Sequence, residues 1–270
     1  MAYKFVFMLK SLSIEWLKLK AYRTFWWLVG LFAVCLIASN YITYQIKAIT
    51  SGGGSNGTLD MILGDPFGFP EVWQTVCYVS SYVLFIPGFL MLILITNEYN
   101  FKTHRQNIID GMSRSTFAKT KMLTATLVSL LATLLVFIIA VITGIVSGSS
   151  FSFHGSIYLF YFLLQALTYT HVGLLIGTIV KKSGIAISIY FTYSVFIKNL
   201  LALLLNRYFD GIGGFTPIKS ADHLIELPFF KQMTKTIIDQ PNLTWLLIMT
   251  VLYLGGFYWA TLKKYTSQDL

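Results

Sequence analysis

Six long apolar stretches dominate the hydrophobic pattern of this chain, and each is long enough to cross a bilayer as a helix. A span needs about 20 mostly apolar residues, because a helix rises about 1.5 Å per residue and the hydrocarbon core is about 30 Å thick. The predicted spans cover residues 25–44, 72–96, 122–146, 157–180, 185–205 and 243–262. The pattern therefore predicts an all-α integral membrane protein, in which residues 1–270 form a single transmembrane domain.

The segment before the first span, residues 2–20, has an amphipathic helical pattern. Its apolar positions are Phe5, Leu9, Leu12, Trp16 and Leu19, and its polar positions are Lys4, Ser11, Glu15 and Lys18. We expect an N-terminal interfacial helix whose lysines face anionic lipid headgroups. A helix packed on a soluble partner is the alternative.

Proline and glycine modify this simple picture at several points. Pro87-Gly88 lies near the middle of the second span, where proline removes a helical hydrogen bond, so we expect a kink there. Gly173-x-x-x-Gly177 and Gly144-x-x-x-Gly148 permit close helix contacts, within the chain or between copies. The connection 206–242 is too long to lack structure, so we expect short helices in it, on the extracellular side.

Charge gives the orientation. Of the 20 lysines and arginines, 14 fall on one side of the predicted spans. These are Lys4, Lys10, Lys18, Lys20, Arg23, Lys102, Arg105, Arg114, Lys119, Lys121, Lys181, Lys182, Lys263 and Lys264. Cytoplasmic loops retain Lys and Arg, so we expect both termini in the cytoplasm and the protein in the cell inner (plasma) membrane.

The composition excludes an ordinary soluble domain, since 56% of residues are hydrophobic, 11% are charged and the mean hydropathy is +0.68. The net charge of +9 would otherwise suggest a nucleic-acid partner. Its one-sided distribution instead points to anionic lipid, so no nucleic-acid partner is expected. The two cysteines, Cys35 and Cys77, lie in apolar segments and indicate no disulfide framework.

The densest polar tract is the predicted cytoplasmic loop 97–121, between the second and third spans. Gly111 can end a short helix there, and Ser113 can cap the next one. We expect a short helix across the membrane surface, which would suit docking to a soluble partner. A solvated loop whose charges serve only orientation is the alternative.

The amphipathic lead-in, the six spans and the pattern Glu98…Arg105…Gly111-Met112-Ser113-Arg114…Lys121 resemble the membrane subunits of ABC exporters of the type-2 permease class. The resemblance implies that loop 97–121 is a coupling helix that docks on a cytoplasmic ATPase subunit. The residues it would place there are Glu98, Lys102, His104, Arg105, Asp110, Gly111 and Arg114. The implied partners are the ATPase subunits, which would bind ATP and Mg²⁺, a second copy or homologous permease, and the lipid bilayer.

The chain is not expected to be an enzyme. It has no GxxxxGK[ST] loop, since Gly177–Ser183 lacks the glycine before the lysine. An intramembrane enzyme would need convergent acids, histidines or nucleophiles, and no carboxylate lies within the predicted spans. No metal or cofactor is therefore expected in this chain. An ATP-independent carrier or channel is the alternative, although it would be expected to show intramembrane acids or an inverted repeat.

Polar residues inside the predicted spans give a possible substrate path. Lys198 and Asn199 lie about two thirds of the way along the fifth span. Lys198 is expected either to reach the outer interface or to line an outward route for an anionic or lipid-like substrate. His171, in the fourth span, is expected to be a hydrogen-bonded packing residue, and a proton relay is the alternative.

Overall fold

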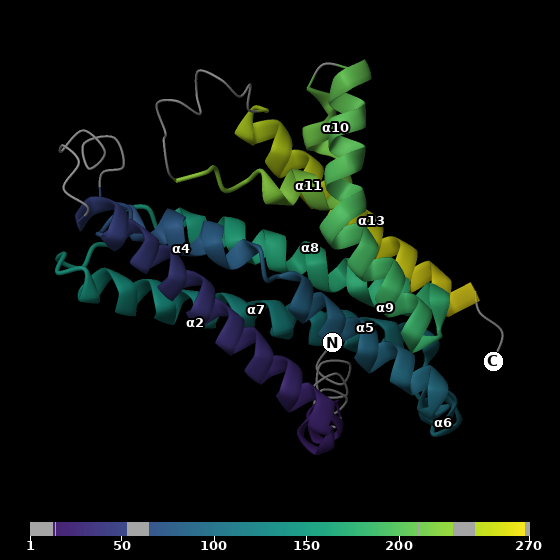
Figure 1. Ribbon diagram of the computed structural model, residues 1–270. Helices are drawn as coiled ribbons and strands as arrows, with labels where there is room; N and C mark the ends of the chain where they lie inside the picture. The colour runs from purple at the N-terminus through teal and green to yellow at the C-terminus, as the bar shows by residue number, and fades with distance from the viewer. Residues whose placement is uncertain (1–12, 14, 53–64, 210, 229–240, 268–270) are drawn as a thin grey trace.

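A computed structural model describes residues 13, 15–52, 65–209, 211–228 and 241–267, which form an all-helical bundle (Figure 1). The long helices are α2 (Arg23–Gly52), α5 (Phe85–Asn100), α7 (Arg114–Val146), α8 (Ile157–Val180) and α13 (Leu243–Ser267). The shorter ones are α4 (Val72–Ser81), α6 (Thr103–Ile109), α9 (Ser183–Phe191), the π-helix η1 (Thr192–Ile197), α10 (Lys198–Tyr208), the 3₁₀-helix η2 (Ile212–Phe215) and α11 (Pro217–Asp222).

The prediction of an α-helical membrane protein is confirmed at the level of fold class. Five helices are long and apolar enough to cross a membrane, and α4 with α5 makes a sixth if the bent pair is one span. Large apolar side chains remain exposed along them, such as Trp27 at 79%, Val34 at 63% and Leu203 at 63%. Since monomeric soluble proteins rarely expose so much contiguous apolar surface, lipid is the natural cover for these faces.

The break in the second span lies one turn before the predicted kink. The chain bends by 45° between α4 and α5, at residues 82–84, and the helix resumes at Phe85. Pro87 then occupies the first turn of α5, where its missing N–H costs no helical hydrogen bond. The proline therefore begins a helix rather than bending one.

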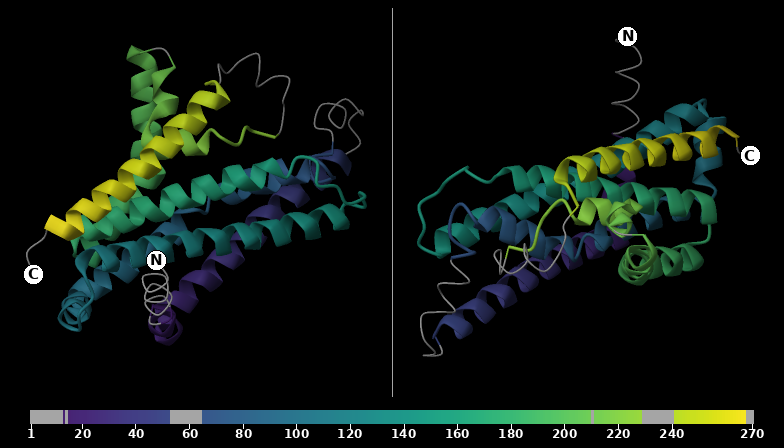
Figure 2. Two further views of the ribbon diagram at one scale, coloured as in Figure 1. Left: turned by 180° about the vertical axis from the view of Figure 1, so that it is seen from behind. Right: turned by 90° about the horizontal axis from the view of Figure 1, so that it is seen from above.

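The fifth span is also less regular than predicted. The helical run extends from Ser183 to Tyr208, but η1 widens it into a π-helix directly before Lys198. α10 projects away from the layer formed by α4, α5, α7 and α8 (Figures 1 and 2). π-Helical turns are rare overall, and those that occur are frequently found at functional sites. The position of η1 therefore makes Lys198 a candidate functional residue.

The core lies between α5 and α8, which make the most extensive contact in the bundle. Glycine permits this approach: a Cβ on Gly173 would lie 2.2 Å from the Gly88 carbonyl oxygen, and one on Gly177 would lie 2.3 Å from Ile95. The predicted close contact at Gly173-x-x-x-Gly177 is thus confirmed, within the chain. At the other pair, Gly144 packs against the Phe69 ring, whereas a Cβ on Gly148 would meet nothing within 4 Å, and Gly148 has a φ of +79°.

Replacing Gly173 by Ala is expected to lower the free energy of unfolding by about 1–3 kcal/mol, because the methyl group must push two backbones apart. The matched control is Gly255→Ala in α13, where a Cβ meets nothing within 4 Å. This control is expected to be neutral or slightly stabilising, since alanine favours helix over glycine. Chemical denaturation of the purified protein in detergent measures both, and equal effects would contradict the packing argument.

Two predicted segments are described only in part. Of the predicted interfacial helix 2–20, residues 2–12 and 14 lie outside the described residues, and residues 15–21 are helical. Glu15, which the pattern assigns to the polar face, is buried, whereas Trp16 of the apolar face is half exposed. In the connection 206–242, η2 and α11 confirm the predicted short helices, and residues 210 and 229–240 lie outside the described residues.

Candidate functional site

The two ends of the bundle carry different chemistry. One end, here called the α6 end, contains α6, the start of α7, the turn between α8 and α9 and the last turn of α13. The other region, here called the α11 site, lies where α11 meets α8, α10 and α13. The predicted coupling residues other than Glu98 lie at the α6 end, and the predicted substrate-path residues lie at the α11 site.

Local backbone geometry sets α6 between two spans. Lys102 has a left-handed conformation, with φ of 57°, and turns the chain from α5 into α6. Gly111, with φ of +97°, follows the last turn of α6, where a left-handed residue commonly ends a helix. The Ser113 hydroxyl accepts a hydrogen bond from the Thr116 N–H at 3.1 Å and caps α7. Both predictions, for Gly111 and for Ser113, are confirmed.

Most of the predicted coupling residues are accessible at this end. Lys102, Arg105, Asp110 and Gly111 are exposed, and His104 and Arg114 are half-buried. Two large apolar side chains flank α6 and are more exposed than most: Phe101 at 73% and Ile109 at 75%. The short helix thus presents mixed charge and apolar contacts, which is the composition that protein interfaces use.

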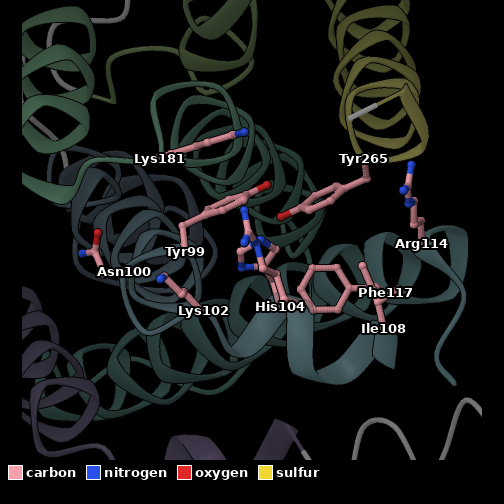
Figure 3. A pocket seen from close by; sticks show the side chains of 10 residues that line it. Tyr99, Asn100, Lys102, His104, Ile108, Arg114, Phe117, Lys181 and Tyr265 are labelled. Atoms are coloured by element: carbon pink, nitrogen blue, oxygen red, sulfur yellow. The ribbon is translucent and has the colours of Figure 1, made fainter. Parts of the chain in front are cut away.

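A cavity of about 250 Å³ lies behind α6, between it, α7 and α13 (Figure 3). Ten residues line it: Tyr99, Asn100, Lys102, His104, Arg105, Ile108, Arg114, Phe117, Lys181 and Tyr265. The hydroxyl ends of Tyr99 and Tyr265 point toward one another across its centre (Figure 3). The His104 ring lies 4.6 Å from that of Tyr99, and its Nδ1 is 3.1 Å from the Glu98 carbonyl oxygen.

Glu98 belongs to a different structure, a buried ion cluster. Lys121 Nζ donates to Glu98 Oε1 at 2.6 Å and to Glu15 Oε2 at 2.5 Å. Lys18 adds a second cation, 3.4 Å from each carboxylate. The cluster ties the helical residues 15–21 to α5 and α7, so Glu98, which the resemblance assigns to the coupling region, is buried rather than exposed beside α6.

Lys121 also shows that the helix begins before the predicted span. The pattern predicts a loop up to residue 121, but α7 begins at Arg114, and Lys121 is only 3% exposed. Burial disfavours ionised Glu15, yet the charges of Lys121 and Lys18 outweigh it and lower the pKa of Glu15. A carboxylate held in this way stabilises the fold above its ordinary pKa and loses that contribution as the pH falls through its lowered value.

At the α11 site, Lys198 has a partner that the sequence did not indicate. Its Nζ donates to Asp222 Oδ2 at 2.5 Å and also bonds the Tyr169 hydroxyl, which itself donates to Asp222 Oδ1 at 3.0 Å. The side chains of Lys198 and Asp222 are 11% and 17% exposed. Lys198 therefore neither snorkels freely nor stands alone: α11 folds back and brings a carboxylate to it.

A cavity of about 520 Å³ opens beside this pair, with Tyr78, Phe85 and Asp222 among the residues on its walls. Asn199 lines it too, and its Oδ1 accepts from Lys219 Nζ at 3.0 Å. Burial lowers the pKa of Lys219 and, together with the charge of Lys219, that of His223. Both predicted path residues, Lys198 and Asn199, thus line one amphipathic cavity.

The histidine and the two cysteines that lie in the predicted spans show no arrangement for catalysis among the described residues. His171 is buried in α8, with Nδ1 2.8 Å from the Leu167 carbonyl oxygen, as expected for a packing histidine. Within the residues that the structure describes, no three His, Cys, Asp or Glu side chains gather to hold a metal ion. Cys77 is buried and Cys35 half-buried, each with a free thiol.

No protein-family model and no curated protein sequence matches this chain. The resemblance to type-2 ABC permeases therefore stays a prediction, and function must be argued from the two sites.

Proposed function

We propose that this chain is the permease subunit of an ATP-driven exporter, coupled through α6 to separate cytoplasmic ATPase subunits. The observation that carries the proposal is the geometry of α6. It is a short, exposed helix held between two long apolar helices, with Phe101, Arg105, Ile109 and Asp110 accessible. Such a helix can receive a partner without disturbing the packing of the spans.

Force on α6 would have a direct path into the bundle. The Glu98 carbonyl oxygen accepts from Thr103 Oγ1 at 3.5 Å and contacts His104, while the Glu98 carboxylate bonds Lys121 of α7. Displacing α6 would therefore move α5 and α7 together. In an export cycle, this movement would alternate the access of the substrate path between the two sides of the membrane.

The cavity at the α11 site supplies the proposed substrate path. It combines aromatic walls with the Lys198–Asp222 pair, so it offers both apolar surface and polar groups to an amphipathic substrate. Two copies of the chain, or one copy with a homologous permease, would complete the path.

One observation favours a second candidate, an ATP-independent carrier. The sequence has no acidic residue within the predicted spans. In the fold, however, Asp222 pairs with Lys198, and both residues line the cavity at the α11 site. Ion-coupled carriers use such paired groups, in which protonation or ion binding changes the pairing. This candidate predicts transport in membranes without ATP, whereas the exporter requires ATP hydrolysis.

Affinity purification from gently solubilised membranes tests the exporter. The wild type is expected to bring down an ATPase, and Arg105→Glu in α6 is expected to reduce its recovery at least about tenfold, since reversing a charge at a specific interface costs several kcal/mol. The matched control is Lys119→Glu, an exposed cation in the first turns of α7 that does not line the α6 cavity. Absence of an ATPase from a folded wild type would favour the carrier.

A further inference from the structure

The cavity behind α6 has the composition of an anion site. Four of its lining residues are cationic, namely Lys102, Arg105, Arg114 and Lys181, and none of the ten is acidic. In the described part of the chain, Lys102, Arg105 and Lys181 form no ion pair; the ammonium of Lys181 lies 5.3 Å from the centre of the Tyr99 ring. Cations gathered around one cavity repel one another, and an anion that joins them replaces this repulsion with attraction.

Backbone turns place two of these cations at the cavity. Among the described residues, only two that are not glycine have positive φ, and these are Lys102 at 57° and Lys181 at 60°. Lys102 is the N-cap of α6 and Lys181 the C-cap of α8, where a left-handed residue commonly ends a helix. Both line this cavity, and in Figure 3 they lie on either side of Tyr99.

We propose that this cavity binds the phosphate of an anionic phospholipid. Several cationic donors match the many acceptor oxygens of a phosphate, whereas a single carboxylate would need fewer donors. A volume of about 250 Å³ falls below the ~300–1,000 Å³ typical of sites for drug-sized ligands, and it suits a headgroup. The inference goes beyond the proposed function, because the ligand is a lipid and no ATPase takes part.

The surface beside the cavity identifies lipid as the source of the phosphate. Ile179 and Ile185 flank the Lys181 turn and are 54% and 53% exposed, so acyl chains could lie along α8 and α9. On α13, Trp259 is 61% exposed and carries Lys263 over its ring at 4.8 Å. Aromatic and cationic residues of this kind mark the membrane–water interface, which places the cavity at headgroup depth.

Native mass spectrometry of the full chain in neutral detergent tests the proposal, with phosphatidylglycerol as the probe. Lys181→Asn removes the charge and keeps a residue that tolerates left-handed backbone, and it is expected to weaken binding about tenfold or more. The matched control is the neighbouring Lys182→Asn, since Lys182 is exposed but does not line the cavity. It is expected to change binding less than about twofold, because rim charges contribute little.

Further variants and ligands distinguish a specific lipid site from diffuse surface attraction and from a site for a soluble phosphate. Lys102→Asn, on the other wall, is the second variant and is expected to repeat the loss, and Lys181→Arg is expected to retain binding. Phosphatidylcholine, with no net charge, is expected to bind weakly, and glycerol 3-phosphate is expected not to displace the lipid. Equal weakening by Lys181→Asn and Lys182→Asn would mean diffuse surface attraction and would overturn the proposal. Displacement by glycerol 3-phosphate at similar concentration would overturn the lipid as the source.

Discussion

Replacing Lys121 by Met is expected to lower the free energy of unfolding by about 3–5 kcal/mol, the range found when one partner of a buried ion pair is removed. Glu15 and Glu98 are each 8% exposed and would face one another with, among the described residues, only the half-buried Lys18 paired to offset their charge. Methionine preserves most of the volume of the lysine chain, so lost packing contributes little. Chemical denaturation in mixed micelles measures the effect.

The control for this prediction is Lys119→Met, because Lys119 is exposed on the same helix two residues earlier. It is expected to change stability by less than about 0.5 kcal/mol. The triple variant Glu15→Gln, Glu98→Gln, Lys121→Met is expected to recover part of the loss, since it removes both buried carboxylates and leaves the remaining charge on the half-buried Lys18. A loss in the triple variant as large as in Lys121→Met would show that shape, rather than charge, dominates at this position.

Replacing Lys198 by Met is expected to cost about 2–4 kcal/mol for the same physical reason, with a smaller effect because the pair is less buried. Asp222 would keep only the Tyr169 hydroxyl as a donor among the contacts described above. Chemical denaturation in mixed micelles measures the effect.

Two variants make this second prediction specific. Asn199→Ala is the control, since Asn199 is exposed and adjacent in the chain, and it is expected to be nearly neutral. Adding Asp222→Asn to Lys198→Met is expected to restore part of the stability. A cost for Lys198→Met that is not relieved by Asp222→Asn would contradict the ion-pair account.

The helices and their caps could be predicted because their signals are local. Apolar runs mark the spans, and Gly111 and Ser113 act within a few residues of their own positions. Boundaries were less accurate where a helix continues past its apolar run, as α7 does from Arg114 to Lys121. A hydropathy profile assigns a lysine to a loop, because the profile contains no information on the two carboxylates that neutralise Lys121 in the fold.

The ion pairs of Lys121 and Lys198 could not be predicted, since they join different helices that meet only in the fold. Lys121 contacts Glu15 across 106 positions, and Lys198 contacts Asp222 only because α11 folds back onto the bundle. The pattern assigns Asp222 to an extracellular connection and leaves no carboxylate in the predicted spans to pair with Lys198. The cavity behind α6 was missed for the same reason: Lys181 and Tyr265 come from distant segments, although Lys102, His104, Arg105 and Arg114 were singled out from the loop.

Site-specific photo-crosslinking from Ile109 tests the central claim most directly, because Ile109 is 75% exposed at the end of α6. A photoreactive amino acid there is expected to capture an ATPase subunit in intact membranes. The same group at Phe196, a 61% exposed residue of η1, is expected to capture lipid or another membrane helix. If Ile109 captures no ATPase while Phe196 reports a folded protein in the membrane, α6 is not a coupling helix and the exporter is contradicted.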